Sequence, residues 1–251
     1  MNLSVCIDAL FSGKDFADSM KTVKDAGIKA FEFWTWENKD IQAIKKAKDK
    51  LGMDIVGFCT KFVSLVDPSQ REMYLSGLKE SIETAKVLGC KNLITQVGSE
   101  RTGVSREEQH QSLVDGLKAC VTILEKEDIT LLVEPLNTIT DHKGYYLSSS
   151  REAFEIIDEV ASSKVKVLFD IYHQQIMEGN LISNITKNID KIGHFHAAGV
   201  PGRHDLTTGE ICYPNVFDAI DKTGFTGYTG LEYFPVDGKI EIYSTKSKCG
   251  T

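Results

Sequence analysis

The stretch LSGLKESIETAKVLGCKNLITQ, residues 75–96, contains the unit from which the whole chain is built. Its first part has apolar residues three or four positions apart, which is typical of the buried face of an amphipathic helix. These residues are Leu75, Leu78, Ile82 and Ala85. Gly89 then interrupts the pattern, as glycine commonly does at a helix C-terminus. The apolar run at residues 92–96 is short enough for a buried strand, so the stretch predicts a helix followed by a strand.

The same unit recurs from one end of the sequence to the other. Predicted strands fall at residues 3–7, 30–34, 54–59, 92–96, 129–134, 165–170, 192–196 and 227–232, with seven helices between them. Alternating strands and helices imply a parallel sheet covered on both faces. Eight such units in a chain of 251 residues match a (β/α)8 TIM barrel. No Pro-rich or Ser-rich linker interrupts the series, so we expect one TIM-barrel domain over residues 1–251.

A doubly wound open sheet is the main alternative fold. Its dinucleotide-binding form has a glycine-rich loop after the first strand. Here the corresponding loop contains Phe11-Ser12-Gly13-Lys14, which disfavours that form. The barrel is therefore the predicted architecture.

Composition limits the partners and the compartment. The formal net charge is −7, which argues against a nucleic-acid binder, and no apolar run approaches the length of about 18 residues that a membrane helix needs. The six cysteines form no Cys-x-x-Cys pair, a pattern typical of free thiols in a reducing compartment. No secretory signal is visible at the N-terminus. We therefore expect a cytoplasmic protein with a small-molecule substrate, and leave a homo-oligomer open.

Four potential metal ligands end the last four predicted strands. They are Glu134, Asp170, His196 and Glu232. In a TIM barrel the C-terminal ends of the strands meet at one mouth, where the active site lies. Oxygen donors with one nitrogen suit a divalent ion such as Mg²⁺ or Mn²⁺. Any one of these residues alone could be a helix cap or a core residue, but four in succession predict a site.

Other polar and aromatic residues follow the same strands. His173 comes three residues after Asp170 and is placed to reach the same cavity. Arg203 lies on a glycine-containing loop that suits a substrate clamp. Trp34 and Trp36 follow the second strand and are either an apolar wall or core residues.

The motifs around these residues resemble the xylose-isomerase-like TIM-barrel superfamily, and within it most closely the hydroxypyruvate isomerase family. The motifs are Glu134-Pro135-Leu136-Asn137, Asp170-Ile171-Tyr172-His173-Gln174-Gln175, Gly193-His194-Phe195-His196, Pro201-Gly202-Arg203-His204 and Gly230-Leu231-Glu232-Tyr233. The resemblance spans nearly the whole chain, and its last third is the most specific part.

The resemblance implies an isomerase that moves a proton on a small hydroxy-carbonyl substrate through an enediolate. It implies that Glu134, Asp170, His196 and Glu232 bind one divalent metal ion, Mg²⁺ or Mn²⁺. By the same resemblance, Glu134 and Glu232 also serve as catalytic acid and base. His173 and Arg203 are implied to contact substrate oxygens.

One position departs from the pattern. Hydroxypyruvate isomerases usually have Gln where this chain has His196, and histidine there is typical of the ketose 3-epimerases that act on tagatose and psicose. A ketose 3-epimerase is therefore the main alternative, and a polyol dehydratase and a non-catalytic sugar-binding barrel also stay open. Endonuclease IV relatives need additional histidines on earlier strands, and this chain has none before His110.

Overall fold

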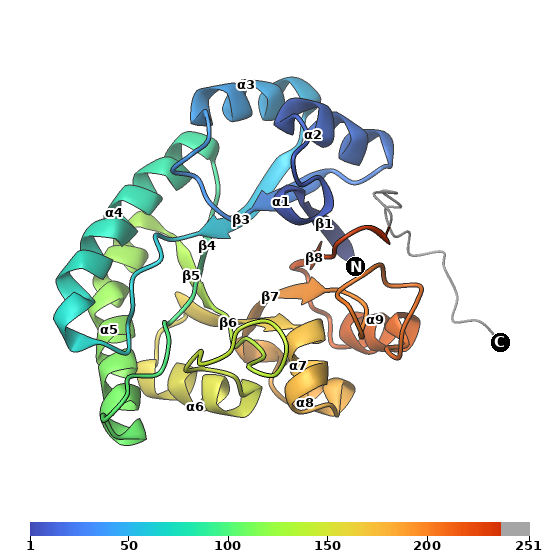
Figure 1. The fold of residues 1–251 in the computed structure, drawn as a ribbon. Helices are drawn as coiled ribbons and strands as arrows, with labels where there is room; N and C mark the ends of the chain where they lie inside the picture. Colours follow the sequence, from blue (N-terminus) through green and yellow to red (C-terminus); the bar gives the residue numbers. More distant parts are fainter. Residues whose placement is uncertain (237–251) are drawn as a thin grey trace.

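The computed structural model describes residues 1–236, and these form a closed barrel of eight parallel strands, as predicted. Figure 1 shows the strands at the centre and the helices around them. The strands are β1 (Asn2–Cys6), β2 (Ala30–Phe33), β3 (Asp54–Cys59), β4 (Asn92–Thr95), β5 (Thr130–Val133), β6 (Val165–Asp170), β7 (Ile192–Ala197) and β8 (Tyr228–Leu231). Pairing of β1 with β8 closes the barrel. The predicted domain also included residues 237–251, which lie outside the described part of the chain.

The seven predicted helices are present, and two short helices were not predicted. The long helices are α2 (Phe16–Asp25), α3 (Ile41–Leu51), α4 (Arg71–Leu88), α5 (Arg106–Glu127), α6 (Ser150–Val160) and α9 (Tyr213–Lys222), and α8 (Leu181–Lys187) is shorter. The unpredicted ones, α1 (Ile7–Leu10) and α7 (Ile171–Met177), start directly after β1 and β6. Two 3₁₀ turns, η1 (Pro68–Gln70) and η2 (Ile189–Lys191), complete the described elements.

The ends of the helices follow from local hydrogen bonding. Ser105 and Glu108 form a reciprocal capping box at the start of α5, as their spacing predicts. The same pattern predicts a second box at α6, and there the structure differs. Ser149 accepts a hydrogen bond from the Glu152 backbone, but the Glu152 carboxylate pairs with Arg106 instead. An available guanidinium is a stronger partner for a carboxylate than a backbone amide.

The core consists of a layer between barrel and helices and a smaller cluster among the strands. The smaller cluster contains Cys59, Ile94, Leu132 and Leu168, from β3 to β6, with the Trp34 side chain packed against it. These residues lie near the ends of their strands, so Trp34 is close to the barrel mouth.

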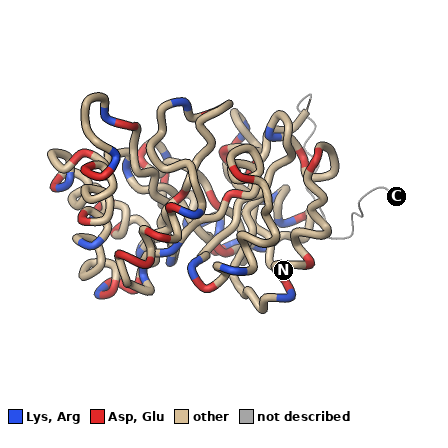
Figure 2. Tube along the Cα trace, turned by 90° about the horizontal axis from the view of Figure 1, so that it is seen from below, with Lys and Arg blue, Asp and Glu red and all other residues tan. Residues whose placement is uncertain are grey.

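The surface and the thiols complete the comparison with the sequence. Figure 2 shows positive and negative positions interspersed over the outer helices. Within residues 1–236 no helix combines the length and apolar character needed to cross a membrane. Cys6, Cys59, Cys90 and Cys120 are buried free thiols as expected, but Cys212 is disulfide-bonded, which corrects the prediction for that residue.

Candidate metal centre and active site

A cavity of about 580 Å³ opens at the C-terminal ends of the strands. One side is formed by residues from β5 to β8 and the loops after them. The opposite side is formed by residues from the first half of the chain. Those residues are Trp34, Cys59, Phe62, Val63, Ser64, Gln70, Ile94, Gln96, Gly98 and Ser99.

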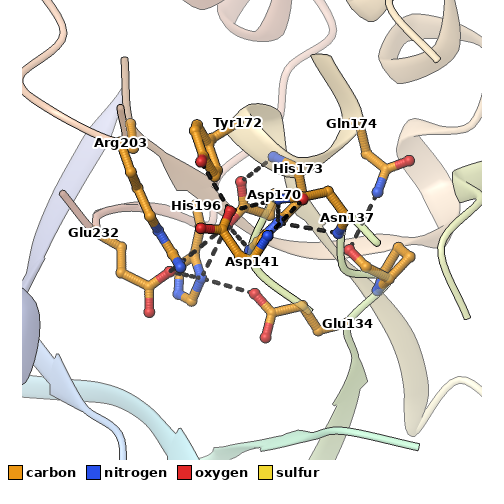
Figure 3. A network of polar contacts seen from close by, with 12 residues as sticks. Glu134, Asn137, Asp141, Asp170, Tyr172, His173, Gln174, His196, Arg203 and Glu232 are labelled. Carbon is orange, nitrogen blue, oxygen red and sulfur yellow. Dashed lines mark hydrogen bonds and ion pairs between the residues drawn. The ribbon is translucent and has the colours of Figure 1, made fainter. Parts of the chain in front are cut away.

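The four predicted ligand residues converge at the floor of this cavity, where three of them, Glu134, His196 and Glu232, line it. Glu134 follows β5, Asp170 ends β6, His196 lies in β7 and Glu232 follows β8. Each offers one donor atom, and these atoms all lie within 4.8 Å of one another. Figure 3 shows their side chains pointing toward a common centre.

His196 Nδ1 is at the middle of the group. It lies 3.1 Å from Glu134 Oε1, 3.2 Å from Glu232 Oε2 and 4.0 Å from Asp170 Oδ2. The parallel pairing explains this arrangement, because Asp170 is in register with His196, and His196 is in register with Gly230 on β8. All four side chains are almost completely buried.

Asp170 also caps the helix that follows it. Its Oδ1 accepts a hydrogen bond of 2.9 Å from the His173 backbone amide at the start of α7. This bond leaves Oδ2 directed at the cluster. Asp170 is therefore both the last residue of β6 and the N-cap of α7, which explains why α7 begins without an intervening loop.

The pKa values of Glu232, Asp170 and His196 in the cluster are shifted from their usual values. Burial would raise the pKa of Glu232, but His196 and Arg203 hold it well below its usual range. For Asp170, burial outweighs Arg203 and raises the pKa of the carboxyl above its usual value. Burial would lower the pKa of His196, but Glu232 and the other surrounding carboxylates raise it well above that of a free imidazole.

The donor set fits a divalent cation. Three carboxylates gather around one imidazole nitrogen, so the site concentrates negative charge where burial penalises it. Arg203 compensates part of it, with Nη2 2.5 Å from Glu232 Oε2 and 3.9 Å from Asp170 Oδ2. Three oxygen donors and one nitrogen, with one side open to a cavity, suit a hard or borderline ion with free coordination positions.

His173 lies in the same cavity, where the sequence places it. Its Nδ1 accepts a hydrogen bond of 3.1 Å from the Asn137 backbone amide. Burial, and next the positive charge of Arg203, lower the pKa of His173 to about 3, so the ring is neutral near pH 7. With Nδ1 as acceptor the proton lies on Nε2, which makes no hydrogen bond among the described residues but lies 3.5 Å from Asp170 Oδ2. His173 therefore presents an N–H donor next to the cluster.

Arg203 is held between aromatic rings. Its guanidinium lies 5.4 Å from the centre of the Tyr172 ring and 5.7 Å from that of Phe234. The residue has a φ of 57°, and its backbone oxygen accepts a hydrogen bond of 2.8 Å from Phe234. These contacts hold the positively charged guanidinium of Arg203 at the edge of the cavity.

Sequence reasoning missed several supporting side chains. Trp34 has a polar role besides lining the cavity or packing in the core, because its indole Nε1 donates a 2.5 Å hydrogen bond to Glu232 Oε1. Gln96 Nε2 donates at 3.3 Å to Glu134 Oε2. Trp36 instead reaches Ser81, away from the cavity. Glu32 and His194 lie buried beside His196, and a charged residue within the apolar run of β2 was the available signal.

Comparison with known proteins agrees with this architecture. A family model described as "xylose isomerase-like TIM barrel" matches residues 20–246. A protein named hydroxypyruvate isomerase from Escherichia coli K12 is 33% identical over 244 residues, covering 94% of each chain.

Two solved structures illustrate the fold match. A structure titled AP endonuclease, family 2, from Brucella melitensis has a TM-score of 0.88 at 25% identity and 94% coverage of both chains. An L-ribulose 3-epimerase has a TM-score of 0.78 at 19% identity, covering 93% of this chain and 82% of the other.

Proposed function

Since the chain belongs to the xylose isomerase-like TIM-barrel family, in the branch of the hydroxypyruvate isomerases, we propose that it moves a proton on a small hydroxy-carbonyl substrate with the help of one divalent metal ion. The relatives make it an isomerase or epimerase. The observation that carries the proposal is the meeting of Glu134, Asp170, His196 and Glu232 around one point at the floor of an open cavity.

These four residues would hold the ion, and Mg²⁺ or Mn²⁺ suits their oxygen-rich set. When bound, the ion supplies a positive charge that stabilises negative charge developing on the substrate carbonyl oxygen. The remaining roles in the proposed reaction are proton transfer and orientation of the substrate, and side chains of this protein perform both.

Two glutamates are the proposed acid and base. Glu134 Oε1 and Glu232 Oε2 face the centre of the cluster, so the other oxygen of each carboxylate is the one that exchanges a proton with substrate. Trp34 orients that oxygen in Glu232, and Gln96 orients it in Glu134. Because the two residues follow β8 and β5, which are not neighbours in the barrel, they approach a substrate from different sides.

The placement of two bases permits two outcomes. Return of the proton to the adjacent carbon gives aldose–ketose isomerisation, whereas its return to the opposite face of the same carbon, from the second glutamate, gives epimerisation. His173 Nε2 and the Arg203 guanidinium are the proposed donors to substrate oxygens. Both are polar groups that can fix the orientation of the carbonyl compound before the proton moves.

We take a hydroxypyruvate isomerase-like reaction as the primary proposal. A ketose 3-epimerase is the second candidate, favoured by His196 and by the cavity volume of about 580 Å³. That volume is within the range of pockets for drug-sized ligands, so it has room for a six-carbon sugar. A nucleic-acid substrate is disfavoured by the formal net charge of −7 and by the lack of any histidine before His110.

The test is solvent exchange during turnover. The protein, loaded with Mg²⁺ or Mn²⁺, is incubated in D₂O with hydroxypyruvate, tetruloses, pentuloses and hexuloses, and products and deuterium incorporation are followed by NMR. Incorporation next to the carbonyl supports proton transfer, and the product identifies isomer or epimer. If a sugar binds without deuterium exchange and without product, the protein is a non-catalytic sugar-binding barrel.

Matched variants test the acid and base. Glu232→Gln and Glu134→Gln keep the size and the oxygen donor of the side chain but remove its capacity to take a proton. Each should lose at least about 100-fold in turnover, the lower range for loss of a general acid or base. Full turnover by Glu232→Gln with metal still bound would show that Glu232 is not the base.

A further inference from the structure

A second group of buried polar residues lies inside the barrel next to the candidate metal centre. We call Glu32, His194 and His196 the inner cluster, and His196 belongs to both groups. Glu32 comes from β2 and reaches the two histidines of β7, a strand that is not its neighbour. Glu32 is 1% exposed and each histidine 2%, so the cluster has little access to water.

The Glu32 carboxylate is confined by its neighbours. Its Oε2 lies 2.9 Å from His194 Nε2 and 3.5 Å from His196 Nε2. Its Oε1 accepts a hydrogen bond of 3.3 Å from Ser4 Oγ. The backbone of Gly230 packs so closely that a Cβ there would come 1.8 Å from Oε1. The carboxylate therefore has little freedom to turn.

Glu32 Oε2 is placed to act as an acceptor toward both histidines, because one imidazole nitrogen of each faces it. An ionised carboxylate has acceptors and no donor. Any ring nitrogen that faces it is therefore favoured in the protonated N–H form.

The two nitrogens of His196 face different groups. Nδ1 points at Glu134, Asp170 and Glu232, whereas Nε2 lies 3.5 Å from Glu32 Oε2 and makes no shorter hydrogen bond among the described residues. A neutral imidazole has one N–H and one lone pair, and only the nitrogen with the lone pair can bind a cation. The Nδ1 side is available to an ion only if the proton lies on Nε2.

We propose that Glu32 is a positioning residue that holds the His196 proton on Nε2 and so presents Nδ1 to a divalent cation at the candidate metal centre. The inference rests on the proposed function, because it assumes that this centre binds an ion. Carboxylate–histidine–metal arrangements of this kind fix ring orientation and raise the basicity of the ligand. His194 shares the carboxylate and holds it from the other side.

The inner cluster is less suited to an ion of its own. Its three donors are close enough to share one. However, Glu32 and His194 are almost completely buried, and Ser4 and Gly230 pack closely against the Glu32 carboxylate. Glu32 also already has partners on both oxygens.

The experiment measures Mn²⁺ binding by calorimetry on the wild type, Glu32→Gln and Glu32→Ala. Loss of an outer-shell partner typically weakens metal binding by about 10- to 100-fold, and we expect losses in this range, larger for Ala than for Gln. Ser4→Ala is the control, because it removes the contact to Oε1 but leaves the charge that faces His196. Its dissociation constant should stay close to that of the wild type.

A spectroscopic measurement separates positioning from general damage to the core. With ¹⁵N-labelled histidine and Mg²⁺, NMR of the wild type should show His196 protonated on Nε2, and Glu32→Ala should show mixed protonation. A wild-type protein with the proton on Nδ1 overturns the inference even if neither variant folds. Folded Glu32 variants with wild-type affinity and unchanged protonation also overturn it.

Two further outcomes separate this inference from the proposed function. A wild type that binds no divalent ion defeats both. Two Mn²⁺ ions per wild-type chain and one per Glu32 variant would make Glu32 a ligand of a second ion, which overturns the positioning role but leaves the proposed function in place.

Discussion

Replacement of Asp170 by Asn should separate metal binding from fold stability. The change removes one negative charge from the candidate metal centre but keeps an oxygen that can accept the hydrogen bond from the His173 amide. The pKa of Asp170 is raised above its usual 3.8 by burial, ahead of the opposing effect of Arg203. A raised pKa in the folded state means that the ionised carboxylate costs stability at neutral pH. Without metal, Asp170→Asn should therefore be at least as stable as the wild type.

The stabilisation by metal follows from mass action. An ion at 100 times its dissociation constant stabilises the folded state by about 2.7 kcal/mol. The unfolding entropy is about 2.1 cal/mol/K per residue near the midpoint. For 251 residues this amounts to roughly 0.53 kcal/mol/K, so the wild-type midpoint should rise by about 5 °C. A variant that binds about 100-fold more weakly would keep only about 0.4 kcal/mol at the same ion concentration, a shift below about 1 °C.

The assay is thermal unfolding with EDTA and with added Mn²⁺. Asp141→Asn is the matched control, because Asp141 accepts hydrogen bonds from Asn137 and Tyr172 but is not one of the four grouped donors. It should keep the metal-induced shift whatever its own stability. The reasoning is refuted if Asp170→Asn is less stable than the wild type in EDTA and keeps the full shift with Mn²⁺.

Three further predictions concern stability alone. Ala161 is the C-cap of α6 and has a φ of 54°, so Ala161→Gly should raise the unfolding free energy by about 0.5–1 kcal/mol in urea titrations, and a decrease would contradict this. Phe58 is fully buried and stacks on Phe33, so Phe58→Ala should lower the unfolding free energy by about 3–5 kcal/mol. Phe62 is 61% exposed, so Phe62→Ala should change the unfolding free energy by no more than about 0.5 kcal/mol. Similar losses in both variants would disprove the burial argument. Hydrogen bonds from Lys164 and Lys91 lower the pKa of Asp128 to about 2, so its contribution is complete above pH 3.8 and is lost as pH falls through 2. Acid titration should therefore destabilise the wild type more than Asp128→Asn between these values, and equal slopes would exclude the contribution.

The fold and the four ligand candidates could be predicted from sequence because each depends on local order. A buried strand with helices on both sides reads as an apolar run, and the polar residue that ends the run marks the mouth of the barrel. Asp170 illustrates this, since strand end and ligand position coincide. The roles of these residues remain predictions that the experiments above test.

The supporting residues could not be predicted because they depend on distances across the barrel. Trp34 and Glu232 are 198 positions apart, and no periodicity in either segment indicates that the indole meets the carboxylate. Glu32 and His194 are 162 positions apart and belong to strands that do not pair. A charged residue inside a buried strand shows that a partner exists, but only the closed barrel identifies it.

The two halves of the polypeptide contribute different parts of the cavity. The four donors of the candidate metal centre come from β5 to β8 and the residues after them, whereas the facing wall comes from β2 to β4 and the loops that follow. Loops at residues 60–70 and 97–99 could thus diverge, or be exchanged between relatives, without removing a contact to the four donors. An engineer seeking a new substrate would randomise these loop positions and keep Glu32, Trp34 and Gln96 together with the carboxy-terminal half.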